Sequence, residues 1–450
     1  MDPYDVVIVG GSAAGLTAAT TARKHYPKKS ICLLRREEQV PIPCGIPYVF
    51  GTVGAPEKNL MPAQQVLAQN GIDGFIDEVL EVNREARQLV TAGKRQLQYE
   101  KLVWAVGSDP VVPPFQGLEL DGIYAIQKNV PHLERILEAL SSAKSLGVVG
   151  CGFIGVEIAE ECRRKRPELR ISIVEMQHHC LQLVYDEEIC RDAEQKLLDQ
   201  GIELLRDERV KAFEGEGRVS KIKLEGGEEV DVDMVLLGIG AKANTDLAQK
   251  AGLEIGPTGG IQVNRYMQTS DPNIFACGDC AEKVSFFDGQ PCSLKLASLA
   301  TMEARIAGAN LFGTQRVNLG AIGVYSTVLG DSAFAVAGLT VSEAEKKGYN
   351  VVVGEAEAMN RHPGCMPGGA NLKVKLVFEQ GSRVILGGQV AGAKSGGEVI
   401  NTISACIHQR MTADDIATFQ TGTHPALTAS PVSYQLVNAA ETAIGKMMQC

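Results

Sequence analysis

Residues 5–15 read Asp5-Val6-Val7-Ile8-Val9-Gly10-Gly11-Ser12-Ala13-Ala14-Gly15, and this stretch decides the fold of the chain. The apolar run is rich in β-branched side chains, which is typical of a buried parallel strand. A glycine turn follows, and residues 16–26 are expected to form a helix. A strand, a glycine turn and a helix N-terminus together place a pyrophosphate over backbone N–H groups. The stretch therefore predicts a nucleotide-binding α/β domain, with Ser12 in place of the middle glycine of G-x-G-x-x-G.

The next strand is expected over residues 31–34, and its end carries Arg35 and Arg36 where an acid for the ribose hydroxyls is usual. We expect these guanidinium groups to meet the adenosine or a phosphate instead.

A second nucleotide loop is complete. Gly150-Cys151-Gly152-Phe153-Ile154-Gly155 lies between an expected strand at 146–149 and an expected helix at 156–166. The strand after that helix ends in Glu175, 20 residues beyond Gly155, which is the spacing at which an acid meets the ribose 2′-hydroxyl. Because a carboxylate there repels a 2′-phosphate, the sequence predicts NADH as the electron donor, with NADPH disfavoured.

The chain divides at a linker rich in proline and glycine around residues 110–117. The predicted fold class is α/β, with two Rossmann-like nucleotide-binding domains and a C-terminal α+β module in which strands at 374–378 and 384–390 run antiparallel. The predicted domains are 1–115 and 251–322 for the first nucleotide domain, 116–250 for the second, inserted one, and 323–450 for the C-terminal module.

Composition restricts the partners. The 450 residues carry a formal net charge of −10 without a basic tract, which disfavours nucleic acid. No apolar run approaches the roughly 20 residues that span a bilayer, and the N-terminus reads as a strand, so we expect a cytoplasmic protein. The 12 cysteines show no paired spacing and are expected to be mostly free, buried thiols. Cys277-Gly278-Asp279-Cys280 has no second cysteine or histidine pair, so no metal site is expected.

One cysteine stands apart. In Pro41-Ile42-Pro43-Cys44-Gly45-Ile46-Pro47-Tyr48, prolines and a glycine predict a rigid turn that presents the sulfur. If a helix begins at Gly45, Cys44 lies at its N-terminus, where the helix dipole favours the thiolate. The pattern predicts a redox-active or nucleophilic cysteine.

Over essentially its whole length the chain resembles the pyridine nucleotide–disulfide oxidoreductase family. The resemblance is carried by the two glycine loops, by Ala105-Val106-Gly107 and by Asn273-Ile274-Phe275-Ala276-Cys277-Gly278-Asp279. It implies an FAD domain, an inserted NAD domain and an interface domain that completes the active site of a partner in a homodimer. Asp279 would bind the ribityl chain of FAD. The residues expected to bind FAD and NADH are Gly10, Ser12, Ala14, Gly15, Arg35, Arg36, Val79, Ala105, Val106, Gly107, Gly278, Asp279, Ala297, Gly150, Gly152, Phe153, Ile154, Gly155, Glu175 and Gly240.

The position five after Cys44 is Val49, so the Cys-x4-Cys pair of two-cysteine members is absent. The chain is similar to the single-cysteine branch: coenzyme A disulfide, polysulfide and persulfide reductases, NADH oxidases and NADH peroxidases. This implies that NADH reduces FAD, and that electrons then pass to Cys44, which reduces a disulfide, persulfide or polysulfide such as coenzyme A disulfide. Phe153 would cover the nicotinamide site in the empty enzyme.

Three alternatives stay open. The first is an NADH oxidase or peroxidase, which would reduce O2 or H2O2 through a Cys44 sulfenic acid. Oxidases and peroxidases of the branch usually carry a histidine in the first loop, where this chain has Ser12-Ala13-Ala14. The second is a flavin-bound redox sensor. The third is reduction of a metal ion with Cys365 and Cys450 as thiol relays.

Further candidates come from the C-terminal module and the first helix. His424 of a partner subunit is the expected proton donor, although an alanine, Ala429, stands where two-cysteine relatives have a glutamate partner. Cys365 stands where coenzyme A disulfide reductases carry a tyrosine pair; it is a candidate second thiol near Cys44 at the substrate, with a role in packing alone as the alternative. Arg23 and Lys24 are expected to contact the phosphates of coenzyme A.

Overall fold

The computed structural model describes residues 1–449, so Cys450 lies outside the described residues. The chain forms two compact units, each built from three segments. The first combines residues 1–114, 124–142 and 239–321, and the second combines 115–123, 143–238 and the chain from 322 onward.

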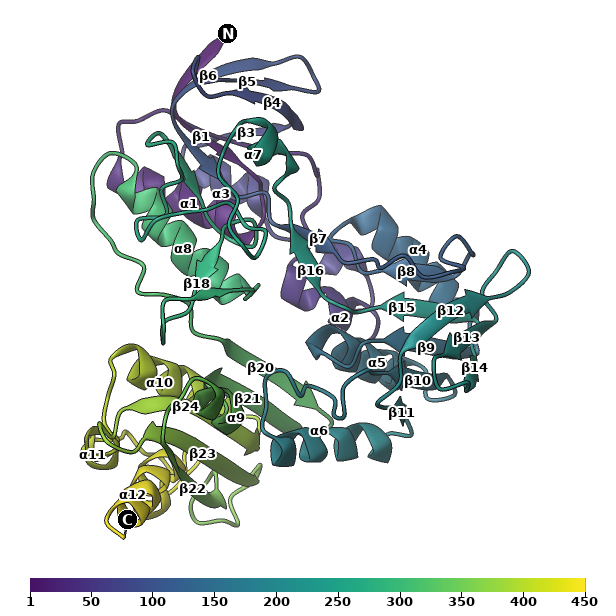
Figure 1. Ribbon diagram of the computed structural model, residues 1–450, viewed down its shortest axis with the longest axis vertical. Helices are drawn as coiled ribbons and strands as arrows, with labels where there is room; N and C mark the ends of the chain where they lie inside the picture. The colour runs from purple at the N-terminus through teal and green to yellow at the C-terminus, as the bar shows by residue number, and fades with distance from the viewer. Residues whose placement is uncertain (450) are drawn as a thin grey trace. The chain divides into compact units, whose positions relative to one another are not determined.

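The first unit is built on a mainly parallel sheet, drawn in Figure 1. Its parallel part runs in the order β3-β2-β1-β6, with β17 beside β6, and an antiparallel extension adds β5 and β4. The strands are β1 (Asp2–Val9), β2 (Ile31–Arg35), β3 (Asp73–Ile76), β4 (Val79–Asn83), β5 (Gln88–Thr91), β6 (Gln96–Trp104) and β17 (Ile274–Ala276). All residues of β2 and β17 are buried, as expected for parallel strands covered on both faces.

Helices α1 (Ala13–His25) and α8 (Ala297–Asn310) lie side by side in this unit. They pack closely because Gly308 has no side chain: a Cβ there would lie 2.7 Å from the carbonyl oxygen of Ala18. The shorter elements of the unit are α2 (Ile46–Val49), α3 (Ala63–Gln69), β7 (Ser108–Pro110), α4 (Val130–Ser142), β16 (Ala241–Ala243), α7 (Asp246–Lys250), β18 (Lys283–Val284) and β19 (Pro291–Cys292).

The second unit contains another parallel sheet, in the order β11-β10-β9-β15, and an antiparallel ribbon β12-β13-β14. The elements are β9 (Ser145–Val149), α5 (Phe153–Lys165), β10 (Arg170–Val174), α6 (Glu187–Asp199), β11 (Glu203–Leu205), β12 (Val210–Glu214), β13 (Lys221–Leu224), β14 (Glu229–Asp231) and β15 (Met234–Leu237). Strand β8 (Ile123–Ala125) lies where the chain passes between the units.

The same unit includes the C-terminal module, an antiparallel sheet in the order β20-β21-β24-β23-β22. Its elements are β20 (Val324–Leu329), β21 (Ser332–Gly338), α9 (Val341–Lys346), β22 (Val351–Met359), β23 (Asn371–Glu379), β24 (Ile385–Gly392), α10 (Gly396–His408), α11 (Ala413–Thr418) and α12 (Gln435–Met447). Helix α12 packs directly on β22, since a Cβ on Gly354 would lie 1.9 Å from the carbonyl oxygen of Ala439.

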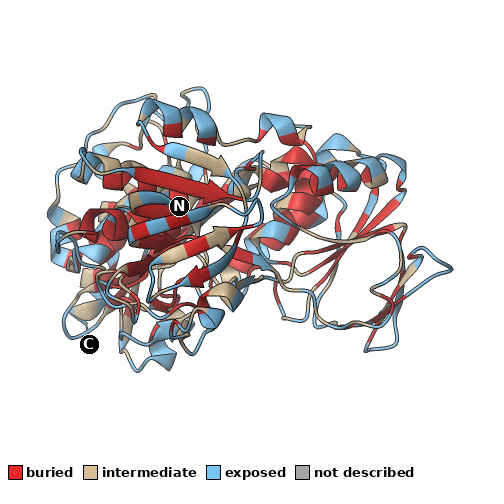
Figure 2. Cartoon of the chain, turned by 90° about the horizontal axis from the view of Figure 1, so that it is seen from above, coloured by how far each residue is buried: buried red, intermediate tan, exposed pale blue. Residues whose placement is uncertain are grey.

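The α/β fold class is confirmed, and the expected strands and helices around both glycine loops are present within a few residues of their predicted ends. Figure 2 shows buried residues along the strands of the sheets, with exposed residues on the outer helix faces. Among the described residues, no helix combines the length and apolarity needed to cross a membrane. The domain boundaries given above stay a prediction.

Candidate active site and its nucleotide-binding loops

The first glycine loop brings the ends of β1 and β6 together. Gly10 has φ +114°, and a Cβ there would lie 2.1 Å from the carbonyl oxygen of Ala105. A Cβ on Gly15 would lie 1.8 Å from the carbonyl oxygen of Gly10. Ser12 caps α1 without a side-chain hydrogen bond, and the first turn carries no acid. The first-turn N–H groups, which have no acceptor within the helix, therefore suit the pyrophosphate of FAD.

A third segment, after β17, completes this cradle. The N–H of Cys277 donates to the carbonyl oxygen of Trp104 at 3.0 Å, which places Gly278 at the end of β6. Gly278 has φ +79°, and a Cβ there would lie 2.8 Å from Cβ of Ala14. Residues expected to bind FAD thus converge from three distant segments because the glycines let the backbones touch, and this set of N–H donors with one carboxylate fits that cofactor.

Asp279 is held in place by side chains that the sequence did not reveal. Its Oδ2 accepts a hydrogen bond from Oγ of Ser108 at 2.7 Å, and Nζ of Lys128 lies 3.6 Å from the same oxygen. A carboxylate fixed in this way is ready to accept hydrogen bonds from a polyol chain.

A buried ion pair braces the Gly278 turn. Glu303 on α8 and Lys283 lie 2.9 Å apart with side-chain exposures of 1% and 4%. Glu303 accepts a hydrogen bond from the N–H of Gly278, and Lys283 donates to its carbonyl oxygen. Burial raises the pKa of Glu303, while the Lys283 ammonium opposes the shift.

The two arginines after β2 differ in their surroundings. Arg35 is buried, and its Nη1 donates to the carbonyl oxygens of Glu37 and Glu38. Its alkyl chain lies against Gly11, where a Cβ would be 2.6 Å away. Arg36 is exposed and pairs with Glu37. Arg35 therefore packs against the glycine loop at Gly11 and supports it. Contact of Arg35 or Arg36 with adenosine stays a prediction. Val79 begins β4, and Ala297 begins α8.

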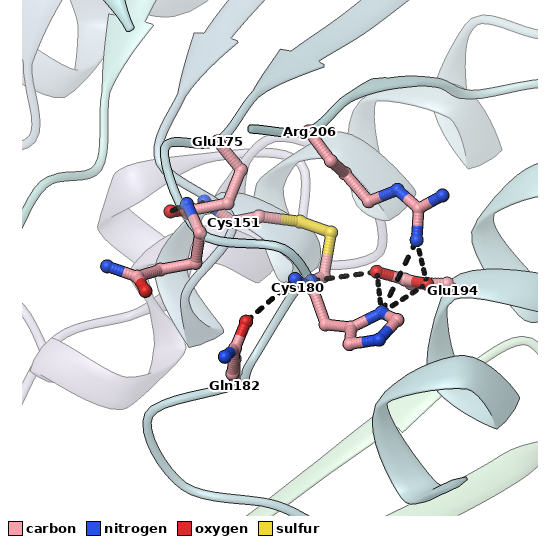
Figure 3. Close-up of a disulfide and its surroundings, with 8 residues drawn as sticks. Cys151, Glu175, Cys180, Gln182, Glu194 and Arg206 are labelled. Carbon is pink, nitrogen blue, oxygen red and sulfur yellow. Dashed lines mark hydrogen bonds and ion pairs between the residues drawn. A yellow bond between two sulfur atoms is a disulfide. The ribbon is translucent and has the colours of Figure 1, made fainter. Parts of the chain in front are cut away.

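The second glycine loop has the same construction. Gly150 has φ +99°, and a Cβ on Gly155 would lie 1.9 Å from the carbonyl oxygen of Gly150. Glu175, at the end of β10, accepts hydrogen bonds from the N–H of Cys151 at 2.7 Å and of Gln177 at 2.8 Å. The expected acid therefore lies against the loop, as Figure 3 shows. Gly152 is the N-cap of α5, Ile154 is exposed, and Gly240, with φ +100°, belongs to the first unit.

Phe153 is enclosed by two tyrosines. Its ring stacks on Tyr325 at a centroid distance of 5.1 Å and meets the edge of Tyr185 at 6.0 Å. One helical turn further on, Glu157 accepts a hydrogen bond from Oγ1 of Thr327 at 2.8 Å. Burial raises the pKa of Glu157 to about 7, although the Thr327 hydroxyl opposes the shift. Sequence reasoning missed Glu157, whose signal was an acid four residues after Phe153 on the inner face of a helix.

Cys44 is exposed in a 3₁₀ turn, Pro43–Gly45. The buried amide of Asn59 holds this turn: its Nδ2 donates to the carbonyl oxygen of Ile42, and a Cβ on Gly45 would lie 2.0 Å from its Oδ1. The expected rigid, sulfur-presenting turn is present. A helix does begin after Cys44, with Gly45 as the N-cap of α2, but α2 is only one turn long and supplies a small dipole.

Comparison with known proteins identifies the family. The sequence-family model of the pyridine nucleotide-disulphide oxidoreductases matches residues 4–304, and the sequence-family model of their dimerisation domain matches residues 324–433.

The chain belongs to this family.

It is therefore a flavin-dependent NAD(P)H oxidoreductase, and it is similar to relatives of two kinds. An NADH oxidase of Methanocaldococcus jannaschii is 30% identical over 98% of this chain and 99% of the relative. An NAD(P)H coenzyme A polysulfide/persulfide reductase of Pyrococcus horikoshii is 32% identical over 86% of this chain and 87% of the relative. The solved structure of an NAD-dependent persulfide reductase from A. fulgidus superposes with a TM-score of 0.90 at 28% identity, covering 99% of this chain and 84% of that one.

The C-terminal module of this oxidoreductase places His424 beside the Cys365 loop. The N–H of Ala426 donates to Nδ1 of His424 at 3.2 Å, so the neutral ring carries its proton on Nε2. The N–H of His362 donates to the carbonyl oxygen of Pro425. The loop containing the exposed Cys365 therefore packs against the His424 segment, within the second unit.

Arg23 has partners within the chain. Its guanidinium donates to the carbonyl oxygens of Pro27, Lys29, Asn70 and Gly71, so it ties α1 to the turn before β3. Lys24 is exposed beside it. A coenzyme A site at these residues stays a prediction.

The cysteines depart from expectation at one place: Cys151, inside the second glycine loop, forms a disulfide with Cys180. The expectation of unpaired thiols was wrong for this pair because 29 residues separate the two cysteines, and only the fold of β9, α5 and β10 brings their Cα atoms to 4.8 Å. Among residues 1–449 the other nine cysteines form no disulfide. Cys277 and Cys280 are fully buried, and burial raises the pKa of both thiols. No group of three or more potential metal ligands occurs in the described part of the chain.

Proposed function

We propose that this oxidoreductase uses NADH to reduce a small disulfide, persulfide or polysulfide, with Cys44 as the nucleophile. The observation that carries the proposal is the exposed cysteine in a turn pinned by Asn59, with no second cysteine five residues on. The relative from Pyrococcus horikoshii and the A. fulgidus structure support a sulfur acceptor, and the name of the former, a coenzyme A polysulfide/persulfide reductase, supports a role for coenzyme A.

The cofactor is proposed to lie over Gly10, Ala14, Gly278 and Asp279, where it would supply two-electron transfer between the nicotinamide and the sulfur chemistry. The first-turn N–H groups of α1 bind its phosphates, and Asp279, oriented by Ser108, accepts hydrogen bonds from its ribityl hydroxyls. NADH is proposed as the preferred donor because Glu175 presents a carboxylate at the loop.

At the acceptor, the Cys44 thiolate attacks one sulfur of R–S–S–R. A Cys44–S–S–R bond forms as the acceptor bond breaks, and the departing thiolate takes up a proton. Nε2–H of His424 from the partner subunit is the proposed donor, because the Ala426 N–H holds the ring in that tautomer. Two electrons and a proton then release the second thiol and restore the Cys44 thiolate. We also propose that the protein acts as a homodimer in the cytoplasm.

The second candidate is NADH oxidation by O2 or peroxide, favoured by the relative from Methanocaldococcus jannaschii. In that chemistry Cys44 cycles through a sulfenic acid. The first loop contributes Ser12, Ala13 and Ala14, none of which can transfer a proton to a peroxide as an imidazole can.

The deciding experiment is anaerobic NADH turnover against coenzyme A disulfide, glutathione persulfide, polysulfide and peroxide, with O2 in a parallel aerobic assay. For Cys44→Ser we expect turnover with the sulfur acceptors to fall by at least about 100-fold, because the nucleophile is gone. Flavin content should be unchanged. The control is Cys292→Ser, a half-buried thiol on β19.

Undiminished turnover of coenzyme A disulfide by Cys44→Ser would refute the proposal. Turnover confined to O2 or peroxide in the wild type would establish the second candidate instead.

A further inference from the structure

The Cys151–Cys180 disulfide lies at the dinucleotide loop, away from the Cys44 turn in sequence and in a different unit. Figure 3 shows it between Glu175, the acid expected to meet the ribose, and the ion pair of buried Glu194 with exposed Arg206. Cys151 is the second residue of the G-x-G-x-x-G loop, and its N–H is the group that donates to Glu175. A covalent bond at this residue therefore acts on the nucleotide site itself.

The disulfide joins the loop to the segment between β10 and α6, residues 176–185. This segment already contacts the loop through its backbone, because the N–H of Leu181 donates to the carbonyl oxygen of Cys151 at 2.9 Å. Leu181 has φ +60°, an uncommon conformation for a residue with a branched side chain. Without the covalent bond, the hydrogen bond between Leu181 and Cys151 and the contact of Tyr185 with Phe153 remain to hold this segment against the loop.

The same segment carries other parts of the nucleotide site. Tyr185, at its end, packs edge-on against Phe153. The backbone of Cys180 is held by α6, since its N–H donates to Oε1 of Glu194 at 2.9 Å. Glu194 is in turn paired with Arg206 at 2.8 Å. The disulfide thus fixes the loop to a segment that is itself anchored to α6. A loop fixed before the ligand arrives loses less conformational freedom on binding, which favours affinity.

We propose that Cys151 and Cys180 form a second, redox-responsive dithiol site, and that their oxidation to the disulfide strengthens binding of the nicotinamide dinucleotide. The oxidant is a small disulfide or polysulfide. One cysteine thiol loses its proton and attacks R–S–S–R, which releases R–S⁻. The second cysteine, also deprotonated, displaces the other R–S⁻ from the mixed disulfide as the Cys151–Cys180 bond forms, and the two released thiolates take up the two protons. The two electrons removed from the two protein thiols appear in the two R–SH products.

This oxidant belongs to the same class of compounds as the acceptor in the proposed function. The inference rests on the proposed function for this oxidant only, since the cross-link itself is part of the structure. The consequence is activation by substrate: when disulfides accumulate, the enzyme that removes them binds NADH more tightly. Both cysteines are fully buried, so exchange requires the 176–185 segment to move aside. Oxidation and reduction of the pair are therefore slow compared with turnover, and the pair follows the ambient thiol–disulfide ratio.

The test uses the flavin-loaded protein equilibrated anaerobically in glutathione and glutathione disulfide at several ratios. The Cys151–Cys180 link is quantified by mass spectrometry after alkylation of the denatured protein. Binding of NAD⁺ to the same samples is measured by titration calorimetry, which requires no acceptor and no turnover. We expect the fraction of linked protein to rise with the proportion of glutathione disulfide, and the Kd for NAD⁺ to be at least about threefold lower in the linked state.

Two matched variants separate this site from the other cysteines. Cys180→Ala should bind NAD⁺ with the weaker affinity at every ratio. Cys162→Ala removes a buried thiol of α5 outside the link and should respond as the wild type does. The two wild-type states decide the question even if Cys180→Ala does not fold.

The inference is overturned if no link forms at any ratio, if the linked and unlinked wild type bind NAD⁺ equally, or if Cys180→Ala still responds to the ratio. A redox-dependent Kd in a protein that reduces no sulfur acceptor would support the inference while refuting the proposed function. Full turnover of sulfur acceptors with a Kd independent of the ratio would do the reverse.

Discussion

Glu157 is a carboxyl group that releases its proton near neutral pH. In the unfolded chain its pKa is the ordinary 4.5, and burial raises it to about 7 in the folded protein. Because the folded state binds the extra proton between these values, the free energy of unfolding decreases as the pH rises through this interval. At pH 8 the folded protein therefore carries a negative charge on the partly buried Glu157, one helical turn from Phe153.

For Glu157→Gln we expect a gain in stability over the wild type at pH 8 that disappears at pH 4.5. The amide still accepts the Thr327 hydrogen bond without the cost of the charge. One pKa unit corresponds to about 1.4 kcal/mol, and partial exposure reduces the full effect, so the expected gain is about 2 kcal/mol. Thermal unfolding across this pH range measures it. The exposed Glu216→Gln is the control, and a gain that is the same at both pH values would contradict the assignment.

His424 allows a second prediction for a single residue. His424→Gln should lower kcat with a disulfide acceptor by about 10²-fold or more, because the departing thiolate loses its proton donor. The rate at which NADH reduces the flavin should stay unchanged in stopped-flow experiments. An equal loss in both steps would show that the imidazole acts through structure and not through proton transfer.

The elements that form the cofactor site depend on glycines at the positions where two backbones touch. For Gly10→Ala we expect almost complete loss of flavin from the purified protein. The added methyl group would meet the carbonyl oxygen of Ala105 at 2.1 Å, and the residue would keep φ at +114°. The ratio of flavin absorbance to protein absorbance measures the loss. Gly313→Ala, where nothing lies within 4 Å of the new Cβ, should retain its flavin. Normal flavin content in Gly10→Ala would show that the two strand ends are not in contact.

These glycines explain why so much of the fold could be predicted from the sequence. Close approach of two backbones requires glycine at a particular position in a strand–turn–helix, so the requirement is visible locally, at Gly10, Gly15, Gly150 and Gly155. Side chains that meet across long separations leave no such local pattern. Glu157 and Thr327 are 170 residues apart, and Glu303 and Gly278 are 25 apart. For the same reason the spacing of Cys151 and Cys180 did not reveal their bond.

At the scale of the whole chain, a buried charged network joins the N-terminal end of α6 to the C-terminal sheet. Nζ of Lys375 on β23 lies 2.8 Å from Oδ2 of Asp186, and each side chain is 8% exposed. Gln389 on β24 donates to the same carboxylate and accepts from the N–H of Asp186. Removing one partner leaves a buried charge without its counter-ion, which is costly.

Lys375→Ala should therefore lower the free energy of unfolding by about 3–5 kcal/mol. Lys373→Ala on the same strand breaks a more exposed pair with Glu355, 3.5 Å away, and should cost less than about 1 kcal/mol. Denaturant unfolding followed by intrinsic fluorescence and by protease susceptibility distinguishes the two variants. Similar losses in both would mean that Asp186 is stabilised without Lys375.

The place of β17 beside β6 has a consequence for biosynthesis. The central strand β6 pairs with β1 (Asp2–Val9) on one side, yet its other parallel neighbour is residues 274–276, and α8 follows only after residue 296. Until then the nascent chain exposes the edge of β6 at Leu102–Trp104 and the apolar face on which α8 will pack. Because unpaired strand edges and apolar faces promote aggregation, chaperones should be needed on the ribosome until residues 274–310 have emerged.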